Sequence, residues 1–183
     1  MKKMAAVCLI LALVTAIFLA GCGGNNAGER DTLSGSTEEL LTAIVVGANK
    51  LLPEDDQLAE SFTDVITAEN SEWVLGVSSD DFARYVTDAY SSTASIITFA
   101  HQVALMKCKD FSSAAQMKRL VASGFDSDKW ICVWPERSFV VESGSYVLLV
   151  ASTNTGGDKI LESFKTLANN NVGEVNIFYK VPL

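Results

Sequence analysis

The hydrophobic and polar positions divide the chain into an unbroken apolar run near its N-terminus and a longer part in which apolar residues recur periodically. The first periodic segment begins at Ser36, which can form a capping box with Glu39, and it ends before Pro53. Its apolar residues recur at helical spacing: Leu40, Leu41, Ile44, Ala48, Leu51 and Leu52. This spacing predicts an amphipathic helix that packs against another surface. A second, shorter helix is predicted after Ser78 and Ser79, with one buried face made of Phe82, Tyr85, Val86 and Ala89.

Strand-like segments alternate with two further helical patterns over the rest of the chain. The predicted strands cover residues 96–99, 103–108, 130–134, 139–141, 146–151 and 175–181. One helix is predicted from Asp110 to Gly124, where the glycine before Phe125 indicates a left-handed helix end. The other helix is predicted over residues 156–167. Ser143 and Gly144 predict the turn of a hairpin.

From residue 103 onward this gives the element order β-α-β-β-β-α-β, which predicts an α+β fold. Strands interleaved with two helices on one side favour a mainly antiparallel sheet of the split βαβ kind. We expect the preceding N-terminal helices to cover the open face of this sheet. Without residues 1–21 about 160 residues remain, which is enough for one globular domain with a substantial core, expected over residues 37–183.

The apolar run near the N-terminus has the features of an export signal. Lys2 and Lys3 supply positive charge ahead of an apolar region over residues 5–20. As a helix this region would span about 24 Å, which is short of the roughly 30 Å hydrocarbon core of a bilayer. We therefore expect a signal peptide that is removed, rather than a lasting transmembrane helix.

A pattern that resembles the bacterial lipobox closes this run: Leu19, Ala20, Gly21 and Cys22. The resemblance implies that a diacylglyceryl group is joined to the sulfur of Cys22 and that signal peptidase cuts between Gly21 and Cys22. Two acyl chains anchor a protein durably in the lipid bilayer, whereas a single chain gives only marginal binding. Residues 22–36 are rich in Gly, Asn and Ser and predict a flexible tether. The alternative is an ordinary secretory signal followed by an incidental cysteine.

Charge and cysteine content fit a lipid-anchored domain at the extracytoplasmic face of the cell membrane. Loss of Lys2 and Lys3 with the signal would change the formal net charge from −8 to −10. Acidic clusters at residues 54–56 and 80–81, in place of a basic face, argue against a nucleic-acid partner. Once Cys8 has been removed and Cys22 lipidated, two cysteines remain: Cys108 and Cys132. They either form one disulfide, which export permits, or serve as buried thiols.

Part of the chain, from about residue 62 to residue 168, resembles a family of small lipoproteins from Gram-positive bacteria. The segments that carry the resemblance are WVLGV at 73–77, MKCKD at 106–110, KWICV at 129–133 and SGSYVLLV at 143–150. The family is defined only by a domain of unknown function. The resemblance implies a lipobox, an extracytoplasmic location and one compact domain, and it implies no catalytic or ligand-binding residues.

The common catalytic motifs are missing from the sequence, and no cofactor is predicted. His101 is the sole histidine, which excludes zinc motifs with paired histidines, and neither Gly-x-Ser-x-Gly nor Ser-x-x-Lys occurs. Asp126 and Asp128 have the spacing of calcium ligands, but the rest of a calcium loop is missing, so a loop that leads into a helix explains them better. Gly156 and Gly157 could present N–H groups to an anion, although a tight turn before a helix requires the same residues.

The tryptophans are the remaining candidates for ligand binding. Trp73, Trp130 and Trp134 are either core residues or exposed indoles that stack on a sugar or a peptide, and Trp130 and Trp134 would share one strand face. The leading hypothesis is a non-enzymatic binding or assembly module that meets an envelope protein or a small ligand. The alternative is a hydrolase that uses His101 with Asp126 and Asp128, which requires these side chains to converge in one cleft.

Overall fold

An antiparallel sheet of six strands runs through the centre of the computed structural model, which describes residues 31–96, 99–130 and 132–180. The strands are β1 (Ser61–Val65), β2 (Val86–Ala94), β3 (Gln102–Cys108), β4 (Arg137–Ser143), β5 (Tyr146–Ser152) and β6 (Asn176–Lys180). They are arranged in the order β1-β2-β3-β5-β4-β6, and every neighbouring pair is antiparallel. The predicted α+β class with an antiparallel sheet is confirmed.

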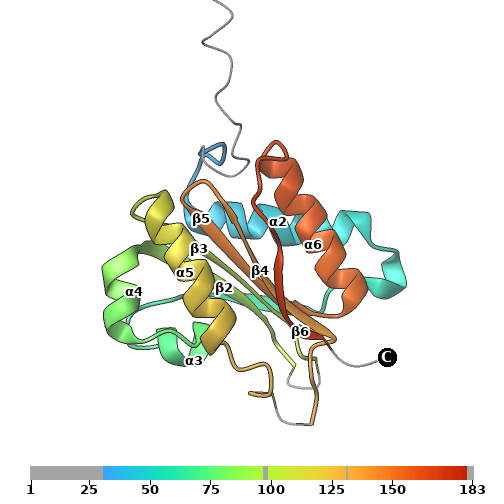
Figure 1. Cartoon of the computed structure of the whole chain (residues 1–183). Coiled ribbons are helices and arrows are strands. Elements are labelled where there is room, and N and C mark those ends of the chain that lie inside the picture. Colours follow the sequence, from blue (N-terminus) through green and yellow to red (C-terminus); the bar gives the residue numbers. More distant parts are fainter. Residues whose placement is uncertain (1–30, 97–98, 131, 181–183) are drawn as a thin grey trace, which may run out of the picture.

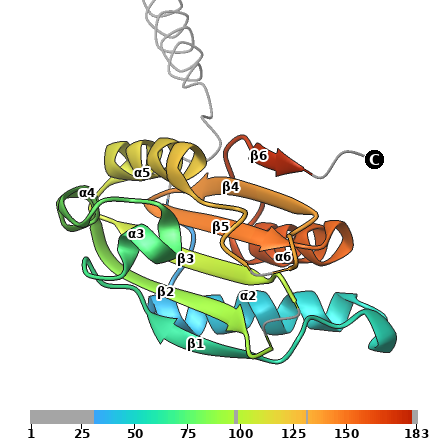
Figure 2. The same cartoon turned by 90° about the horizontal axis from the view of Figure 1, so that it is seen from below.

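Helices cover both faces of the sheet (Figure 1 and Figure 2). On one face lie α2 (Thr37–Leu51), which is followed by the short 3-10 helix η1 (Glu54–Asp56), and α6 (Asn154–Leu167). On the other face lie α3 (Ser71–Leu75), α4 (Ser79–Tyr85) and α5 (Phe111–Gly124). None of the helices among the described residues is long and apolar enough to cross a membrane.

Two split crossovers explain why α5 and α6 lie on opposite faces. α5 connects β3 to β4 and α6 connects β5 to β6, and each connection passes over one intervening strand. β3 and β5 run in opposite directions, yet both crossovers advance the same way along the sheet. Right-handed crossovers are strongly preferred. When both crossovers have the same hand, they place the two helices on opposite faces of the sheet. The expectation that both helices lie on one side is therefore wrong, although the split βαβ arrangement is present.

The face under α2 and α6 is held by large apolar side chains. The predicted capping box starts α2: Glu39 N donates to Ser36 Oγ and Ser36 N donates to Glu39 Oε2, each at 3.2 Å. Ile44 of α2 and Phe164 of α6 are fully buried in the same cluster. Gly47 allows the two helices to approach, because a Cβ at this position would lie 2.2 Å from the Oγ of Ser163.

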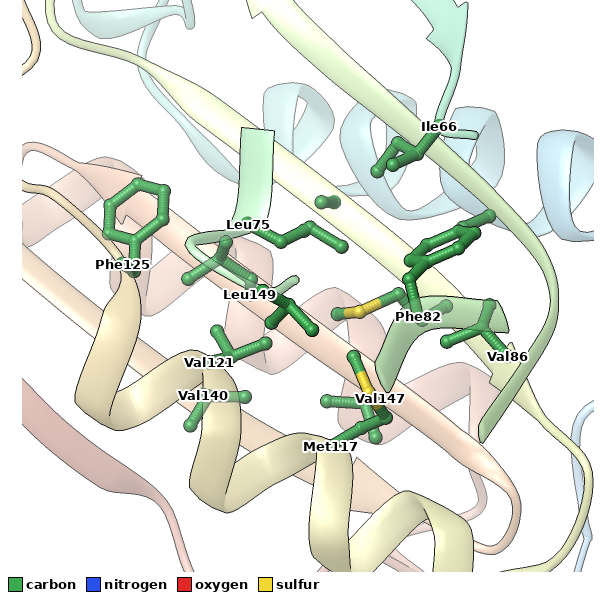
Figure 3. Packing of buried hydrophobic residues seen from close by; sticks show 14 of the residues in the cluster. Ile66, Leu75, Phe82, Val86, Met117, Val121, Phe125, Val140, Val147 and Leu149 are labelled. Atoms are coloured by element: carbon green, nitrogen blue, oxygen red, sulfur yellow. The ribbon is translucent and has the colours of Figure 1, made fainter. Parts of the chain in front are cut away.

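The opposite face has its own apolar cluster. In Figure 3, Met117 and Val121 of α5 point toward the sheet residues Val140, Val147 and Leu149. The middle of the sheet is thus covered on both sides, and all seven residues of β5 are buried. This double burial explains the continuous apolar run in β5, since a strand with one solvated face would alternate apolar and polar residues.

Two glycines bring the ends of α3 and α5 together. Gly76 ends α3 in the left-handed region, with φ of 70°, and a Cβ on Gly124 would lie 2.1 Å from the Gly76 carbonyl oxygen. Gly124 is absent from the described glycines with positive φ. The C-cap residue of α5 is Phe125, whose φ is −63°. The predicted left-handed end at Gly124 is wrong, because this glycine is required for close approach to a neighbouring backbone.

Two predicted strands are not strands at their described residues. Ile96 and Phe99 lie in the connection between β2 and β3, and residues 130 and 132–134 lie in the connection between α5 and β4; residues 97–98 and 131 are outside the described residues. β2 itself begins at Val86, within the predicted helix face. Ile96, Phe99 and Trp134 are each more than half exposed, so their apolar character reflects surface positions rather than a buried strand. Cys132 has φ of 64°, in the left-handed region that strand residues do not adopt.

The globular domain starts earlier than its predicted boundary at residue 37. The Asp31 carboxylate accepts hydrogen bonds from Ser145 N at 2.6 Å and Ser145 Oγ at 3.0 Å, and Leu33 is buried under α2. The C-terminal end of the predicted 22–36 tether is therefore part of the domain. The lipobox, Leu19 to Cys22, and position 181 of the last predicted strand lie outside the described residues.

Both remaining cysteines are free thiols, and the alternative of two buried thiols is correct for Cys108 but wrong for Cys132. Cys108 is buried on β3, Cys132 is exposed in the α5–β4 connection, and neither is bridged. Burial raises the pKa of the Cys108 thiol to about 12, with a smaller contribution from the nearby Asp110 carboxylate. Cys108 is thus a small apolar side chain of the core, and the alternative of a disulfide with Cys132 is not realised.

Candidate functional site

A groove of about 400 Å³ lies beside β1, the strand at one edge of the sheet; we call it the Trp73 groove. Phe62 and Asp64 of β1 pair with Thr93 and Ser91 of β2, and Thr93 pairs with Gln102 of β3. Cross-strand partners share one face of a sheet, so these side chains form a floor that is mostly polar. The wall is made by α3 and the segment after α5: Trp73, Val74, Lys129 and Trp130.

Two aromatic side chains are presented to solvent at this groove. The side chain of Trp73 is 69% exposed and that of Phe62 is 51% exposed. Trp130 is partly buried instead and packs against Phe125, with 6.3 Å between the ring centroids. Trp73 is therefore the more exposed indole of this groove, and the Lys129 ammonium lies over its ring, 5.8 Å from the centroid.

Lys129 fixes the wall of the groove. Its Nζ donates to the carbonyl oxygens of Trp73 and Val74, both at 3.2 Å, and lies 4.5 Å from the ring centroid of Phe125. Burial lowers the pKa of Lys129 to about 8, while the Asp126 carboxylate opposes this shift. Because Lys129 holds the backbone of α3 at the residue that carries the exposed indole, we treat it as a positioning residue for Trp73.

The floor leaves polar groups for a ligand. Gln102 donates from Nε2 to the Val74 carbonyl at 2.9 Å and is held in place. In contrast, the side chains of Asp64 and Thr93 have no hydrogen bond or ion pair with any described residue. An exposed indole beside unused polar groups is the arrangement expected of a site that contacts both the apolar and the polar parts of a ligand.

His101 lies elsewhere, in a larger cleft of about 650 Å³ that we call the His101 cleft. Its Nδ1 and the Oγ of Ser152 are 2.9 Å apart, and the residue is only 4% exposed. Burial lowers the pKa of His101 to about 4, so the ring is neutral at neutral pH. Within the described residues, the buried Nε2 has no hydrogen-bond partner.

The predicted hydrolase constellation is not assembled. Asp126 and Asp128 do not line the His101 cleft, and the Asp126 carboxylate instead accepts from Asp128 N at 2.8 Å within its own loop. Ser152 is 2% exposed, although its hydroxyl neighbours His101. In the part of the chain that the structure describes, no group of three or more His, Cys, Asp or Glu side chains is placed to hold a metal ion.

The helix start near Gly156 and Gly157 is occupied by the protein itself. Gly156 N donates to Thr153 Oγ1 at 3.0 Å, and Asn154 N donates to Glu136 Oε2 at 2.7 Å. A Cβ on Gly157 would lie 3.1 Å from a guanidinium nitrogen of Arg137. These glycines therefore serve close packing and capping, and the anion-binding alternative has no support in the geometry.

Trp130 and Trp134 do not share a face, because the strand that would have aligned them is absent. Trp130 lines the Trp73 groove, whereas Trp134, 54% exposed, lines the His101 cleft. The sequence-based search did not find Phe62, Asp64 or Lys129. The strand-forming residues Phe62, Thr63 and Val65 were the local signal for an edge strand.

Comparison with family models, curated proteins and solved structures finds no match to the chain. The resemblance to small lipoproteins of Gram-positive bacteria therefore stays a prediction from the sequence.

Proposed function

We propose that the protein is a lipid-anchored, non-enzymatic binding module at the extracytoplasmic face of the membrane, and that its Trp73 groove takes a saccharide of the cell envelope. The anchor rests on the lipobox resemblance at Cys22. The ligand class rests on the groove. The described part of the chain begins at residue 31, and the groove lies toward the opposite end of β3: Gln102 lines the groove, whereas Lys107 and Cys108 lie beside Asp31.

The exposed indole of Trp73 is the observation that carries the ligand class. A sugar ring has an apolar face of C–H groups and a rim of hydroxyls, so it stacks on an indole while its hydroxyls reach polar groups beside it. Trp73 is 69% exposed, and the unpaired side chains of Asp64 and Thr93 lie in the same groove. A purely apolar ligand would leave these two groups buried without partners, which is unfavourable.

A glycan array probed with the full chain in detergent tests this proposal. We expect binding to a subset of envelope-type saccharides, with loss of about tenfold or more in the Trp73→Ala variant because the stacking surface is removed. Trp134→Ala is the matched control, since it also deletes an exposed indole but from the other cleft. Equal binding by both variants, or no saccharide bound at all, would exclude the Trp73 groove as a saccharide site.

Cross-linking in living cells distinguishes a protein partner from a saccharide. A photo-reactive residue in place of Phe62, 51% exposed at the groove, would label whatever occupies it. Saccharide adducts support the proposal. One reproducible envelope protein at this position would replace it with an assembly role.

A further inference from the structure

The His101 cleft has features of a second, separate binding site. No described residue lines both this cleft and the Trp73 groove. The cleft is formed where four described segments meet: residues 55–59, residues 99–101 before β3, residues 133–136 before β4, and residues 152–155 at the junction of β5 with α6. Its volume of about 650 Å³ is within the range of small-molecule sites.

The charged groups of the cleft are all acidic. Asp55, Asp56 and Glu136 line it, and among the described lining residues there is no lysine or arginine. The nearest basic residue in sequence, Arg137, is paired with Asp158 at 2.5 Å. The cleft therefore favours a positively charged ligand and disfavours an anion.

Two aromatic side chains lie in the same cleft and are open to solvent. Trp134 is 54% exposed and Phe99 is 53% exposed. The face of an aromatic ring attracts cations, and its apolar surface accepts an alkyl chain. Aromatic rings combined with carboxylates are the chemistry that recognises an organic cation rather than a hydrated metal ion.

His101 adds an unsatisfied polar atom. Its Nε2 is buried without a partner in the described residues, while Nδ1 is engaged with the hydroxyl of Ser152. When Nδ1–H donates to that hydroxyl, Nε2 is an acceptor that an N–H group of a ligand can satisfy. Leaving such an atom unpaired is unfavourable, so a ligand with N–H donors would relieve it.

We propose that the His101 cleft binds a primary organic ammonium, with its carbon chain against Trp134 and Phe99 and its charge facing the acidic side chains. A quaternary ammonium has the same charge but no N–H group, and an alcohol of equal length has no charge. Both should therefore bind more weakly than the primary ammonium. The proposal is independent of the saccharide site, because none of the described residues lines both the cleft and the groove.

Calorimetric titration of the full chain in detergent with n-pentylammonium and with 1-pentanol tests the charge requirement. We expect saturable binding of the ammonium and at least about tenfold weaker binding of the alcohol at low ionic strength. n-Pentyltrimethylammonium, which keeps the chain and the charge, tests the N–H requirement and should bind more weakly than n-pentylammonium. No binding of n-pentylammonium, or equal binding of the alcohol, would overturn the proposal.

Variants assign the binding to this cleft. Trp134→Ala should weaken n-pentylammonium binding by about 3- to 10-fold, and the double variant Asp55→Asn with Asp56→Asn should weaken it and reduce its salt dependence. Both changes are at exposed positions, so the fold is retained. Trp73→Ala is the control and should bind like the unmodified chain. Unchanged binding in both cleft variants would place the ammonium elsewhere and refute the assignment.

Discussion

His101 illustrates how a single buried residue can link the core to a surface cleft. The ring lies at the end of the sheet, is almost fully buried, and has Ser152 as its hydrogen-bond partner. Desolvation disfavours the imidazolium form, which lowers the pKa of His101 from 6.5 to about 4. The neutral ring adds no positive charge to a cleft whose charged side chains are acidic.

The lowered pKa of His101 predicts a loss of stability in acid. As the pH falls below 6.5, the unfolded chain takes up a proton at this histidine, whereas the folded chain does so only near pH 4. The free energy of unfolding should therefore decrease between pH 6.5 and 4, by about 3 kcal/mol from this group at full effect. Urea unfolding at a series of pH values measures the decrease.

His101→Gln is the comparison for this measurement, because glutamine does not titrate and the carboxylates of the protein are the same in both chains. We expect the variant to be less stable at pH 7 but to lose less stability between pH 6.5 and 4. Parallel pH profiles for the two proteins would show that the histidine is not buried in its neutral form.

At the scale of elements, the contact between the short helix α3 and the longer helix α5 determines the geometry of the Trp73 groove. α3 has only five residues and carries Trp73 and Val74. It is held against the end of α5 by the contact of Gly76 with Gly124, and against the following loop by Lys129. The exposed indole is thus positioned by backbone contacts and one cation rather than by a large apolar interface.

Gly124→Ala should disrupt the contact between α3 and α5. The added methyl group would lie 2.1 Å from the carbonyl oxygen of Gly76, so the two backbones must separate. We expect a loss of about 1–3 kcal/mol in the free energy of unfolding, measured by denaturant titration. Ser123→Ala, at the exposed position before it, should change stability by less than about 0.5 kcal/mol. Equal effects of the two changes would mean that the helices can separate without cost.

The start of α2 depends on the capping box that the sequence predicted. Ser36→Ala removes the acceptor for Glu39 N and should destabilise the protein by about 1 kcal/mol in thermal or denaturant unfolding. Ser34→Ala, an exposed serine outside the helix, is the control and should be close to neutral. A neutral Ser36→Ala would show that packing of α2 on the sheet, and not its cap, holds the helix start.

For the whole molecule, the first described residues connect the sheet to the preceding segment that carries the lipobox. Asp31, nine residues after Cys22 in the chain, accepts hydrogen bonds from Ser145. Ser145 lies in the turn between β4 and β5. If Cys22 is lipidated, this end of the sheet is the one joined through residues 23–30 to the anchor. The anchor is a prediction from the lipobox resemblance.

Cys22→Ala tests the anchor directly. Without the thiol no lipid can be attached, so we expect loss of metabolic fatty-acid labelling and accumulation of the uncut precursor, seen as a larger band on a blot. Cys132→Ala, which removes an exposed thiol of the folded domain, should be labelled and processed normally. Normal processing of Cys22→Ala, with no label on either chain, would indicate an ordinary secretory signal.

The periodic segments of the sequence predicted their elements correctly, whereas the short or surface segments misled. Ser36 and Glu39 identified the start of α2, Asp110 the start of α5, and Gly144 the hairpin between β4 and β5. These features depend on local backbone chemistry, which neighbours in sequence supply. β1 and α3 were missed because each has five residues, too few for a period to be recognised.

The sequence by itself determined the α+β class and the main helices, because periodicity, capping and turn chemistry act over a few neighbouring residues; the lipobox stays a prediction from the sequence. Only the tertiary structure decided which faces the crossover helices cover, that Trp130 and Trp134 belong to different clefts, and that Asp126 and Asp128 lie apart from His101. Strand order and handedness bring together residues that are distant along the chain. No local pattern records these contacts, so the candidate sites emerge only from the folded arrangement.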